Sequence, residues 1–401
     1  MNKFQTLKGF RDFLPPEARK RVWLKNKMIE VFERWGYEPL ETPTLEPLDL
    51  FAGEIGEDEK LFFKFKDNGG RKVALRYDQT VPTCRVIGER FNELVFPFKR
   101  YQIQSNFRSE KPQKGRYREF VQADLDIFGI LSPAADAEII AVNLDLYREL
   151  GFKKAVVLVN NRDLMKGVPY EAIVAIDKLK KIGEEGVIED MVSKGIDKEK
   201  AKEYFNFVKN LNPDETIKTI FDYLRKSGFS EDSYKFEPTL ARSFSYSEGP
   251  IWEIVIPEYG VGSVAGGERY DGLVERISGQ KISGTGVGIG FDRTLEALEA
   301  CNLIPNFSVS TKVLVTVFAP ELFEKSIEIA NKIREIGINT ELYPDPNAKL
   351  EKQLKYADKK GIPFVVIVGQ EEVRSDMVML KDLKTKEQKK LTIEELIKLI
   401  K

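Results

Sequence analysis

A basic segment in the first third of the chain carries the clearest local signal for chemistry. Residues 99–118 read KRYQIQSNFRSEKPQKGRYR and hold seven Lys or Arg side chains against one acid, Glu110, a net charge of +6 in a chain whose total is −1. Arginine binds phosphate oxygens through paired N–H donors. We therefore interpret this basic segment as a candidate phosphate-binding strand–loop–strand, with a solvated hairpin tip as the structural alternative.

A glycine-rich segment, Ser283 to Arg293, reads SGTGVGIGFDR and precedes a helix-like stretch. Glycines let a backbone approach a ligand closely, and an Arg in the following turn can reach a phosphate. The spacing matches neither the dinucleotide fingerprint nor a P-loop. By itself the segment therefore favours a structural strand over a nucleotide site.

Two further kinds of polar residue could line a pocket. The segments RSFSY (242–246) and AGGERYDG (265–272) set Arg and Asp among small and aromatic residues, although each is also typical of a turn between strands. Asp78, Asp124 and Asp126 alternate with apolar residues, and alternate residues of a strand share one face of the sheet. We expect these carboxylates to enter one cleft, with surface exposure as the alternative for any one of them.

Composition excludes several mechanisms. The 401 residues include no histidine, which rules out Ser-His-Asp and Cys-His triads, a histidine base and imidazole metal ligands. Cys84 and Cys301 form neither a zinc pair nor a disulfide framework, so we expect a cytoplasmic protein. No window approaches the roughly 18 apolar residues of a membrane span, so we expect no membrane partner.

The elements that must hold these residues form an α+β pattern. Strand-like runs between residues 61 and 127 lie between helical periodicities at 17–35 and 136–150. Consecutive strands with helices gathered at the ends favour an antiparallel sheet flanked by helices over alternating βαβ units.

Changes in composition mark three regions. Residues 166–229 are almost entirely helical in pattern and predict a helical insertion into a core formed by 1–165 and 230–308. Strand and helix patterns alternate over 311–401, which predicts a compact C-terminal α/β domain.

Taken together and in order, these segments resemble the class II histidyl-tRNA synthetases. The resemblance rests on KGFRDFLP (8–15), the Pro-containing segment 37–47, LRYDQTVP (75–82), FRSEKPQKGRYREFVQADLDIFG (107–129) and GVGIGFDR (286–293). LARSFSY (240–246) and AGGERYDG resemble the two histidine-specific motifs of that family, and KQLKYADKKGIPFVVIVGQEE (352–372) resembles its anticodon-binding domain. The resemblance implies a class II antiparallel catalytic sheet and a C-terminal anticodon-binding domain.

The resemblance also implies a function and a set of site residues. It implies ATP-dependent activation of L-histidine and transfer to tRNA(His) by a homodimer, with Mg²⁺ bound through ATP and no metal held by the protein. The implied catalytic residues are Arg108, Arg242 and Arg293, and ATP binding would add Glu110 to these three. The implied amino-acid-binding residues are Asp78, Thr80, Arg108, Gln122, Asp126, Arg242, Tyr246 and Ser247, with Glu268, Arg269 and Tyr270 in the loop packed beside them. The implied tRNA-binding residues are Lys111, Gln113, Lys114 and Arg116.

Two alternatives stay open at this point. One is a catalytically silent regulatory relative that senses histidine; such proteins typically lack the anticodon domain and the ATP-site arginines, both of which this chain keeps. The other is a synthetase for a related amino acid, because Ser247 stands where the family often has the second residue of a Tyr-Tyr pair.

Overall fold

A computed structural model of the chain describes residues 4–51, 61–112, 116–242, 246–307 and 309–400. The chain divides into two compact units, Met1–Ile304 and Pro305–Lys401. Each has its own hydrophobic core. The two units are therefore described separately.

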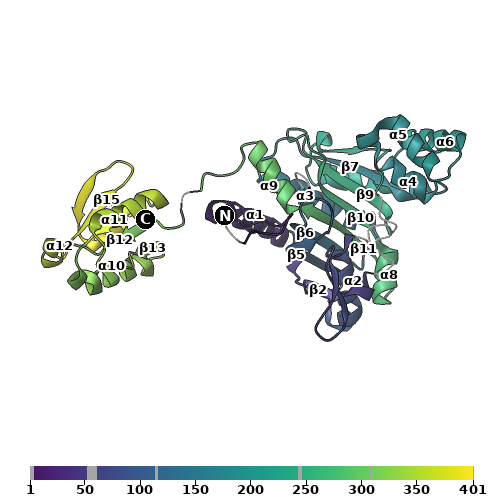
Figure 1. Cartoon of the computed structure of the whole chain (residues 1–401). Helices are drawn as coiled ribbons and strands as arrows, with labels where there is room; N and C mark the ends of the chain where they lie inside the picture. The colour runs from purple at the N-terminus through teal and green to yellow at the C-terminus, as the bar shows by residue number, and fades with distance from the viewer. Residues whose placement is uncertain (1–3, 52–60, 113–115, 243–245, 308, 401) are drawn as a thin grey trace. The chain divides into compact units, whose positions relative to one another are not determined.

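An eight-stranded sheet forms the centre of the first unit (Figure 1). From edge to edge its strands are β1 (Glu38–Pro39), β5 (Phe98–Phe107), β6 (Glu119–Phe128), β11 (Gly284–Gly290), β10 (Ser263–Arg269), β9 (Glu248–Val255), β7 (Val156–Asn161) and β8 (Tyr234–Phe236). The six inner strands are antiparallel to their neighbours, and only the two edge pairs, β1 with β5 and β7 with β8, are parallel.

Four helices pack on one face of this sheet and build the main core: α1 (Pro15–Arg34), α3 (Pro133–Glu149), α7 (Glu215–Lys226) and α9 (Phe291–Ala300). Helix α1 begins at two prolines, whose fixed φ suits a first helical turn. Gly36 follows its end with φ 77°, a left-handed conformation that glycine adopts without strain. Helix α3 is capped by Ser132, whose hydroxyl accepts from the Ala134 N–H.

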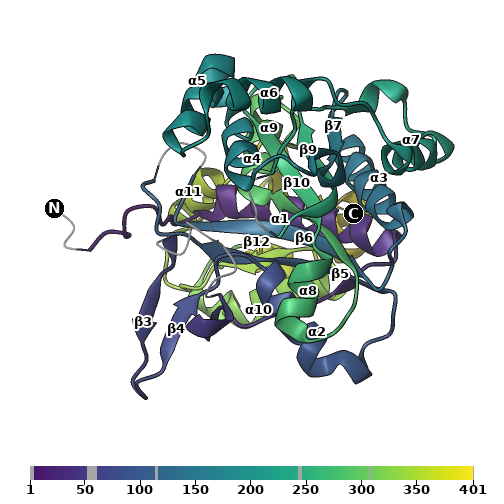
Figure 2. The same cartoon turned by 90° about the vertical axis from the view of Figure 1, so that its right-hand side faces the viewer.

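The opposite face is only partly covered, and this leaves room for a cavity. Helices α2 (Thr80–Arg90) and α8 (Asp271–Ser278) contact each other and lie in front of the sheet in Figure 2. A three-stranded antiparallel sheet lies beside them, in the order β2 (Leu45–Pro47), β4 (Lys72–Leu75), β3 (Lys64–Lys66). The short 3₁₀ helices of this unit are η1 (Leu48–Leu50), η3 (Phe91–Glu93), η4 (Arg162–Met165) and η5 (Glu231–Ser233).

The region 166–229 contributes to two different cores. Helices α4 (Tyr170–Ile176), α5 (Leu179–Ser193) and α6 (Lys198–Lys209) form a small cluster around Ala172, Val187 and Phe205. Helix α7 instead buries Ile217, Ile220 and Leu224 in the main core beside α3. Only the first three helices therefore pack around a separate core.

The second unit is an α/β domain around a five-stranded sheet. Its strand order is β13 (Thr340–Leu342), β12 (Val313–Val315), β14 (Phe364–Ile367), β15 (Val378–Asp382), β16 (Gln388–Leu391). The first three strands are parallel and the last two antiparallel. Its helices are η6 (Pro320–Leu322), α10 (Phe323–Glu335), α11 (Leu350–Lys360), α12 (Gln370–Arg374) and α13 (Ile393–Ile400). Residues of α10 and α13 pack on one face of the sheet and residues of α11 on the other.

The predicted α+β catalytic architecture with a C-terminal α/β domain is confirmed. Two details differ from the sequence-based expectation. Val22, an apolar residue within the helical periodicity at 17–35, is 59% exposed, and the core positions of α1 begin at Leu24. The central sheet is mixed at its edges, because β1 and β8 each run parallel to their neighbour. Among the described residues, no helix is long and apolar enough to cross a membrane.

Candidate active site

One cavity of about 660 Å³ opens on the partly covered face of the central sheet. Its wall contains most of the residues proposed individually from the sequence: Asp78, Thr80, Arg108, Glu110, Arg116, Gln122, Asp124, Asp126, Arg242, Tyr246, Glu268, Tyr270 and Arg293. These residues come from β6, β10, α2, α9 and the loops between elements, so the fold brings distant segments to one place. Ser247 is buried immediately behind the wall.

Strand alternation explains which side chains enter the cavity. On β6, Gln122, Asp124 and Asp126 line it, while the intervening Ala123 and Leu125 belong to the main core. The neighbouring strand β11 exposes Gly286, Gly288 and Gly290 to the cavity in the same way. A Cβ at Gly286 would lie 1.9 Å from Asp126 Oδ1, so glycine is what leaves room for the carboxylate.

The basic segment divides between the cavity and the interior. Arg108 lies over the ring of Tyr77, with 4.2 Å from Cζ to the ring centroid, and faces the cavity together with Glu110 and Arg116. Lys111 lies outside the cavity wall, and Gln113 and Lys114 fall outside the described residues. The expectation of a phosphate trap is wrong for Arg100, which is fully buried. It is paired with Asp126 through a 2.6 Å contact from Nη2 to Oδ2.

The cavity floor holds three buried carboxyl groups. Burial raises the pKa of Asp78 to about 6. Burial also raises the pKa of Asp124 well above its usual range, although the charge of Arg100 opposes the shift. Asp126, whose pKa burial likewise raises, also accepts a hydrogen bond from the Tyr270 hydroxyl. The floor therefore favours ligands that donate hydrogen bonds or carry positive charge.

Gln122 is oriented by two other side chains. Its Oε1 accepts a 2.7 Å hydrogen bond from Asn106 Nδ2, and its backbone carbonyl accepts one of 3.2 Å from Gln79 Nε2. A Cβ at Gly288 would lie 2.7 Å from Gln122 Nε2, so the amide lies close against β11. No local sequence pattern indicates the role of Asn106, because its contact is made only through the β5–β6 pairing.

Arg242 is paired with a carboxylate on β10. Its Nε and Nη2 donate to the two oxygens of Glu268 at 2.9 and 3.2 Å. Burial alone would lower the pKa of Arg242, but the charge and hydrogen bonds of Glu268 outweigh burial and raise it. Arg242 is therefore a cation at every physiological pH.

Arg293 lies in the first turn of α9 and lines the cavity. Its Nη1 donates to the Ser263 carbonyl at 2.7 Å. The adjacent Asp292 accepts from Arg11 and Arg21 through Oδ1, at 2.8 and 2.6 Å, and from the Val121 N–H through Oδ2 at 2.9 Å. The N-terminal segment thus holds the start of α9 against β6.

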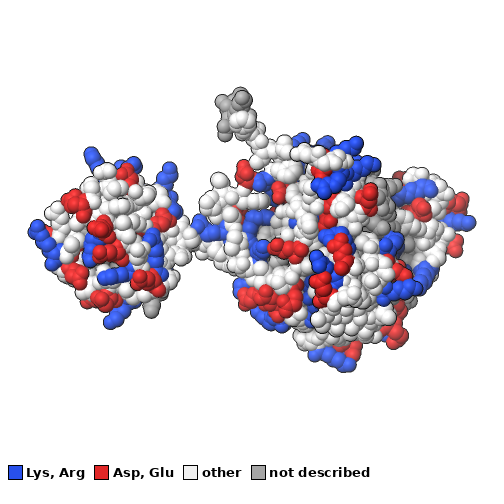
Figure 3. Space-filling view, turned by 90° about the horizontal axis from the view of Figure 1, so that it is seen from below, with Lys and Arg blue, Asp and Glu red and all other residues white. Residues whose placement is uncertain are grey.

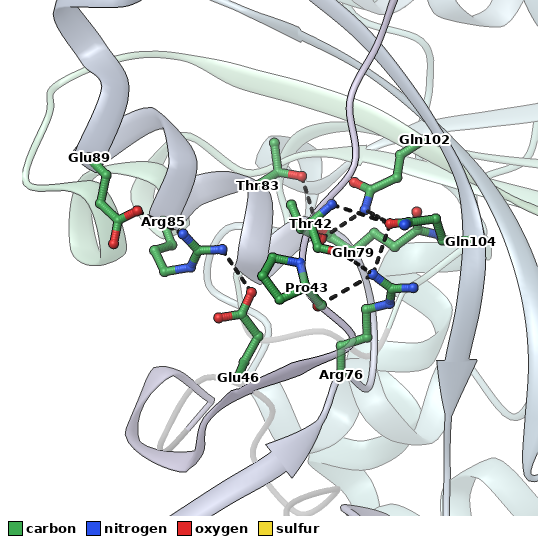
Figure 4. Close-up of polar contacts among 10 residues, drawn as sticks. All are labelled: Thr42, Pro43, Glu46, Arg76, Gln79, Thr83, Arg85, Glu89, Gln102 and Gln104. Atoms are coloured by element: carbon green, nitrogen blue, oxygen red, sulfur yellow. Dashed lines mark hydrogen bonds and ion pairs between the residues drawn. The ribbon is translucent and has the colours of Figure 1, made fainter.

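A polar network fixes the loop that carries Asp78 and Thr80 (Figure 4). Arg76, which is 2% exposed, donates through Nη1 to the Thr42 carbonyl at 2.7 Å and to Gln104 Oε1 at 2.8 Å. Its Nε donates to the Ser105 carbonyl at 2.7 Å. These bonds tie the end of β4 to β5 and to the Pro-containing segment 37–47. The sequence interpretation missed Arg76 because its partners are backbone groups far away in the chain.

Charge on the face drawn in Figure 3 gives no comparable signal. In the face drawn in Figure 3, basic and acidic side chains are interspersed over both units. This distribution agrees with a total of 63 Lys and Arg against 64 Asp and Glu. The cavity therefore differs from this face by its buried ion pairs, and not by an excess of charge of one sign.

A largely antiparallel sheet with one helix-covered face and an arginine-lined cavity on the other agrees with the class II aminoacyl-tRNA synthetase architecture expected from the motifs. The family model described as histidyl-tRNA synthetase matches residues 9–182, and a model described as an anticodon binding domain matches residues 312–401. A crystal structure of histidyl-tRNA synthetase from a Nostoc species superposes with a TM-score of 0.83, at 26% identity over 100% of this chain and 99% of that one.

Curated relatives agree over the full length. A histidine–tRNA ligase of Cytophaga hutchinsonii is 36% identical, covering 99% of both chains. One of Wolinella succinogenes is 37% identical over 96% of this chain and 95% of its own. The chain belongs to the histidyl-tRNA synthetase family.

Proposed function

We propose that this protein activates L-histidine with ATP to form histidyl-adenylate and transfers the histidyl group to tRNA(His). The observation that carries the proposal is the meeting of Arg108, Arg242 and Arg293 with Asp78 and Gln122 in one cavity of a chain from this family. Cations for phosphates and acceptors for an ammonium group then line one space.

The first step is a displacement at phosphorus. The carboxylate of histidine attacks the α-phosphorus of ATP, the new P–O bond forms, and pyrophosphate leaves with the electron pair of the broken bond. Arg242 stabilises the charge that develops on the α-phosphate, while Arg108 and Arg293 hold the other phosphates and Glu110 faces the adenine. This is catalysis by positioning and electrostatic stabilisation, and it needs no protein base.

Mg²⁺ would neutralise phosphate charge when it enters with ATP. Among the described residues, no group of three His, Cys, Asp or Glu side chains could hold a metal ion. The cavity arginines, placed around the phosphate region, fit a metal bound through ATP and not through protein ligands.

Recognition of histidine falls to the floor of the cavity. Asp78, Thr80 and Gln122 hold the ammonium group, and Asp126 with Tyr246 shapes the space for the imidazole. Burial raises the pKa of Tyr246 well above its usual range, so its hydroxyl stays protonated and can donate. Ser247 contributes through Glu268, to which its hydroxyl donates.

In the second step a ribose hydroxyl at the 3′ end of tRNA attacks the adenylate carbonyl, and AMP leaves. We assign tRNA contacts to Lys111, Gln113, Lys114 and Arg116, and anticodon binding to the C-terminal unit. We also propose that the protein is a cytoplasmic homodimer whose contact involves residues 37–47.

A regulatory relative that only senses histidine is not favoured. Such a protein would not need three arginines in one cavity or a C-terminal domain of the anticodon-binding type, and this chain has both.

The test is ATP–pyrophosphate exchange with each of the twenty amino acids, followed by charging of tRNA. We expect exchange with histidine alone. Exchange with a different amino acid would move the assignment to another specificity, and absence of exchange in a folded protein would support the regulatory alternative. The Arg242→Ala variant should slow exchange about 1,000-fold while keeping its fold; near-normal exchange would contradict the role of Arg242.

A further inference from the structure

The contact between Arg242 and Glu268 joins the central arginine of the cavity to a carboxylate of the protein itself. Both side chains are largely buried, at 15% and 8% exposed. The two hydrogen bonds, from Nε and Nη2 to the two carboxylate oxygens, form a bidentate pair. Paired contacts of this kind fix the plane of a guanidinium as well as its position.

The carboxylate is itself held from behind. The Ser247 hydroxyl donates to Glu268 Oε2, the oxygen that also accepts from Arg242 Nε. Ser247 is 6% exposed and lies one residue after Tyr246. The residue that departs from the Tyr-Tyr pattern of the family therefore has a defined contact: it fixes Glu268.

The backbone of β10 also contacts Arg242. A Cβ at Gly266 would lie 2.0 Å from Arg242 Nη1 and 3.1 Å from Cζ, so the guanidinium lies directly against the backbone of β10. Gly266 and Glu268 are two residues apart on this strand and so share its cavity face. Arg242 therefore lies between the backbone of β10 at Gly266 and the carboxylate of Glu268, which are on the same face of the strand.

The buried positive charge of Arg242 explains why a carboxylate, that of Glu268, lies beside it. A buried arginine without a counter-charge is costly, and Glu268 supplies that charge when no substrate anion is bound. A guanidinium has five N–H donors, and Glu268 engages two of them on the Nε–Nη2 side. The pair thus orients Arg242 without using its whole donor set.

We propose that Glu268, fixed by Ser247, is the positioning residue for Arg242 and aims its guanidinium at the reacting carboxylate and α-phosphate. This inference rests on the proposed role of Arg242. The competing assignment is that Glu268 binds the ammonium group of the amino acid directly, since it lies close enough to Asp78 to influence that carboxyl group.

A double-mutant cycle in the full-length protein separates the two assignments. Exchange kinetics are measured for the wild type, Glu268→Ala, Arg242→Ala and the double variant. A positioning role predicts that Glu268→Ala lowers kcat about 100-fold, as for loss of one preorganised electrostatic contact, with KM for histidine changed less than about threefold. The double variant should then be as slow as Arg242→Ala alone, within about twofold, because the effect of Glu268 passes through Arg242.

Losses that multiply in the double variant would overturn the inference, as would a raised KM for histidine at unchanged kcat. Ser247→Ala provides a milder variant: it should lower kcat by about threefold in the wild type and have no effect in the Glu268→Ala background. An equal effect in both backgrounds would contradict the proposed link through Glu268.

The matched control is Asp145→Asn, which removes the charge of another buried carboxylate, 2.5 Å from Arg148 Nη2 and outside the cavity. Its kcat should stay within about twofold of the wild type; a loss equal to that of Glu268→Ala would mean that breaking any buried pair suffices. If the wild-type protein showed no histidine-dependent exchange, the proposed function would be wrong, and so would the inference that rests on it. With an active wild type, only the cycle decides the role of Glu268.

Discussion

At the scale of single residues, the cavity keeps carboxyl groups in places where burial opposes their ionisation. Asp78 is 7% exposed, and its Oδ1 accepts a 3.1 Å hydrogen bond from the Val81 N–H. That bond and the charge of Arg108 lower its pKa less than burial raises it. To bind an ammonium group this carboxylate must be ionised. Because it is buried, its ionisation lowers the stability of the folded protein.

Replacement of Asp78 by Asn should stabilise the protein at neutral pH. The pKa is about 6 in the folded protein against 3.8 for a free aspartate side chain, so between these pH values the unfolded chain ionises while the folded protein keeps the proton. Stability from this group is complete below about pH 4 and lost as the pH rises to about 6, a change of about 3 kcal/mol. Because Asn does not ionise, the Asp78→Asn variant does not lose this stability as the pH rises.

Thermal unfolding of Asp78→Asn and the wild type should therefore coincide near about pH 4 and diverge toward about pH 7.5, with the variant more stable and inactive in exchange. Asp232→Asn, at an exposed position, serves as the control and should show no such divergence. A difference that does not vary with pH would show that Asp78 is not the source.

Local motifs allowed the prediction of the residues whose placement depends on their own segment. Alternation along one strand was enough to bring Asp124 and Asp126 to the cavity face, and short motifs pointed to Arg108 and Arg242. Arg100 was grouped with the phosphate-binding cations because nothing local shows that its strand sets it opposite Asp126. Pairing register between strands is a property of the folded sheet, and single-sequence patterns do not contain it.

At the scale of elements, two adjacent glycines of β10 have different roles: Gly266 borders the cavity, and Gly267 borders the hydrophobic core. A Cβ at Gly266 would meet the guanidinium of Arg242, whereas a Cβ at Gly267 would lie 2.2 Å from Cε2 of the buried Trp252 ring. Successive residues of a strand face opposite sides, so one glycine serves the cavity and the other the core.

The two glycines should therefore fail in different ways when changed to Ala. Gly266→Ala should displace Arg242 and lower kcat about 10- to 100-fold with little change in the unfolding midpoint. Gly267→Ala should overpack the core and cost about 1–3 kcal/mol in the free energy of unfolding. Exchange kinetics and chemical denaturation of both variants check this, and a pair of variants with the same profile would contradict the assignment of faces.

Elements themselves were predictable to within a few residues where periodicity was strong, as for α1 and α3. Strand β16, with the sequence QKKL, was missed because it has no apolar alternation and is a strand only through its pairing with β15. The sequence also grouped α7 with the helical insertion, since composition does not reveal that Ile217 and Leu224 pack against the main core.

At the scale of the whole molecule, adenylate chemistry and the C-terminal fold depend on separate sets of residues. Every residue of the cavity wall lies before the boundary at Ile304. The cores of the C-terminal unit are formed by residues after it, among them Val313, Ile329 and Val366. Removing one unit should therefore leave the other with its own core intact.

A protein truncated after Ile304 should consequently keep ATP–pyrophosphate exchange within about twofold of full length, because no residue of the removed unit lines the cavity. Charging of tRNA should fall about 100-fold, as expected when contacts worth about 3 kcal/mol of binding are lost. The companion fragment 305–401 should fold alone, which circular dichroism and thermal unfolding can establish. Unchanged charging by the truncated protein would remove the C-terminal unit from tRNA recognition, whereas loss of exchange in a folded fragment would show that the unit acts on the cavity itself.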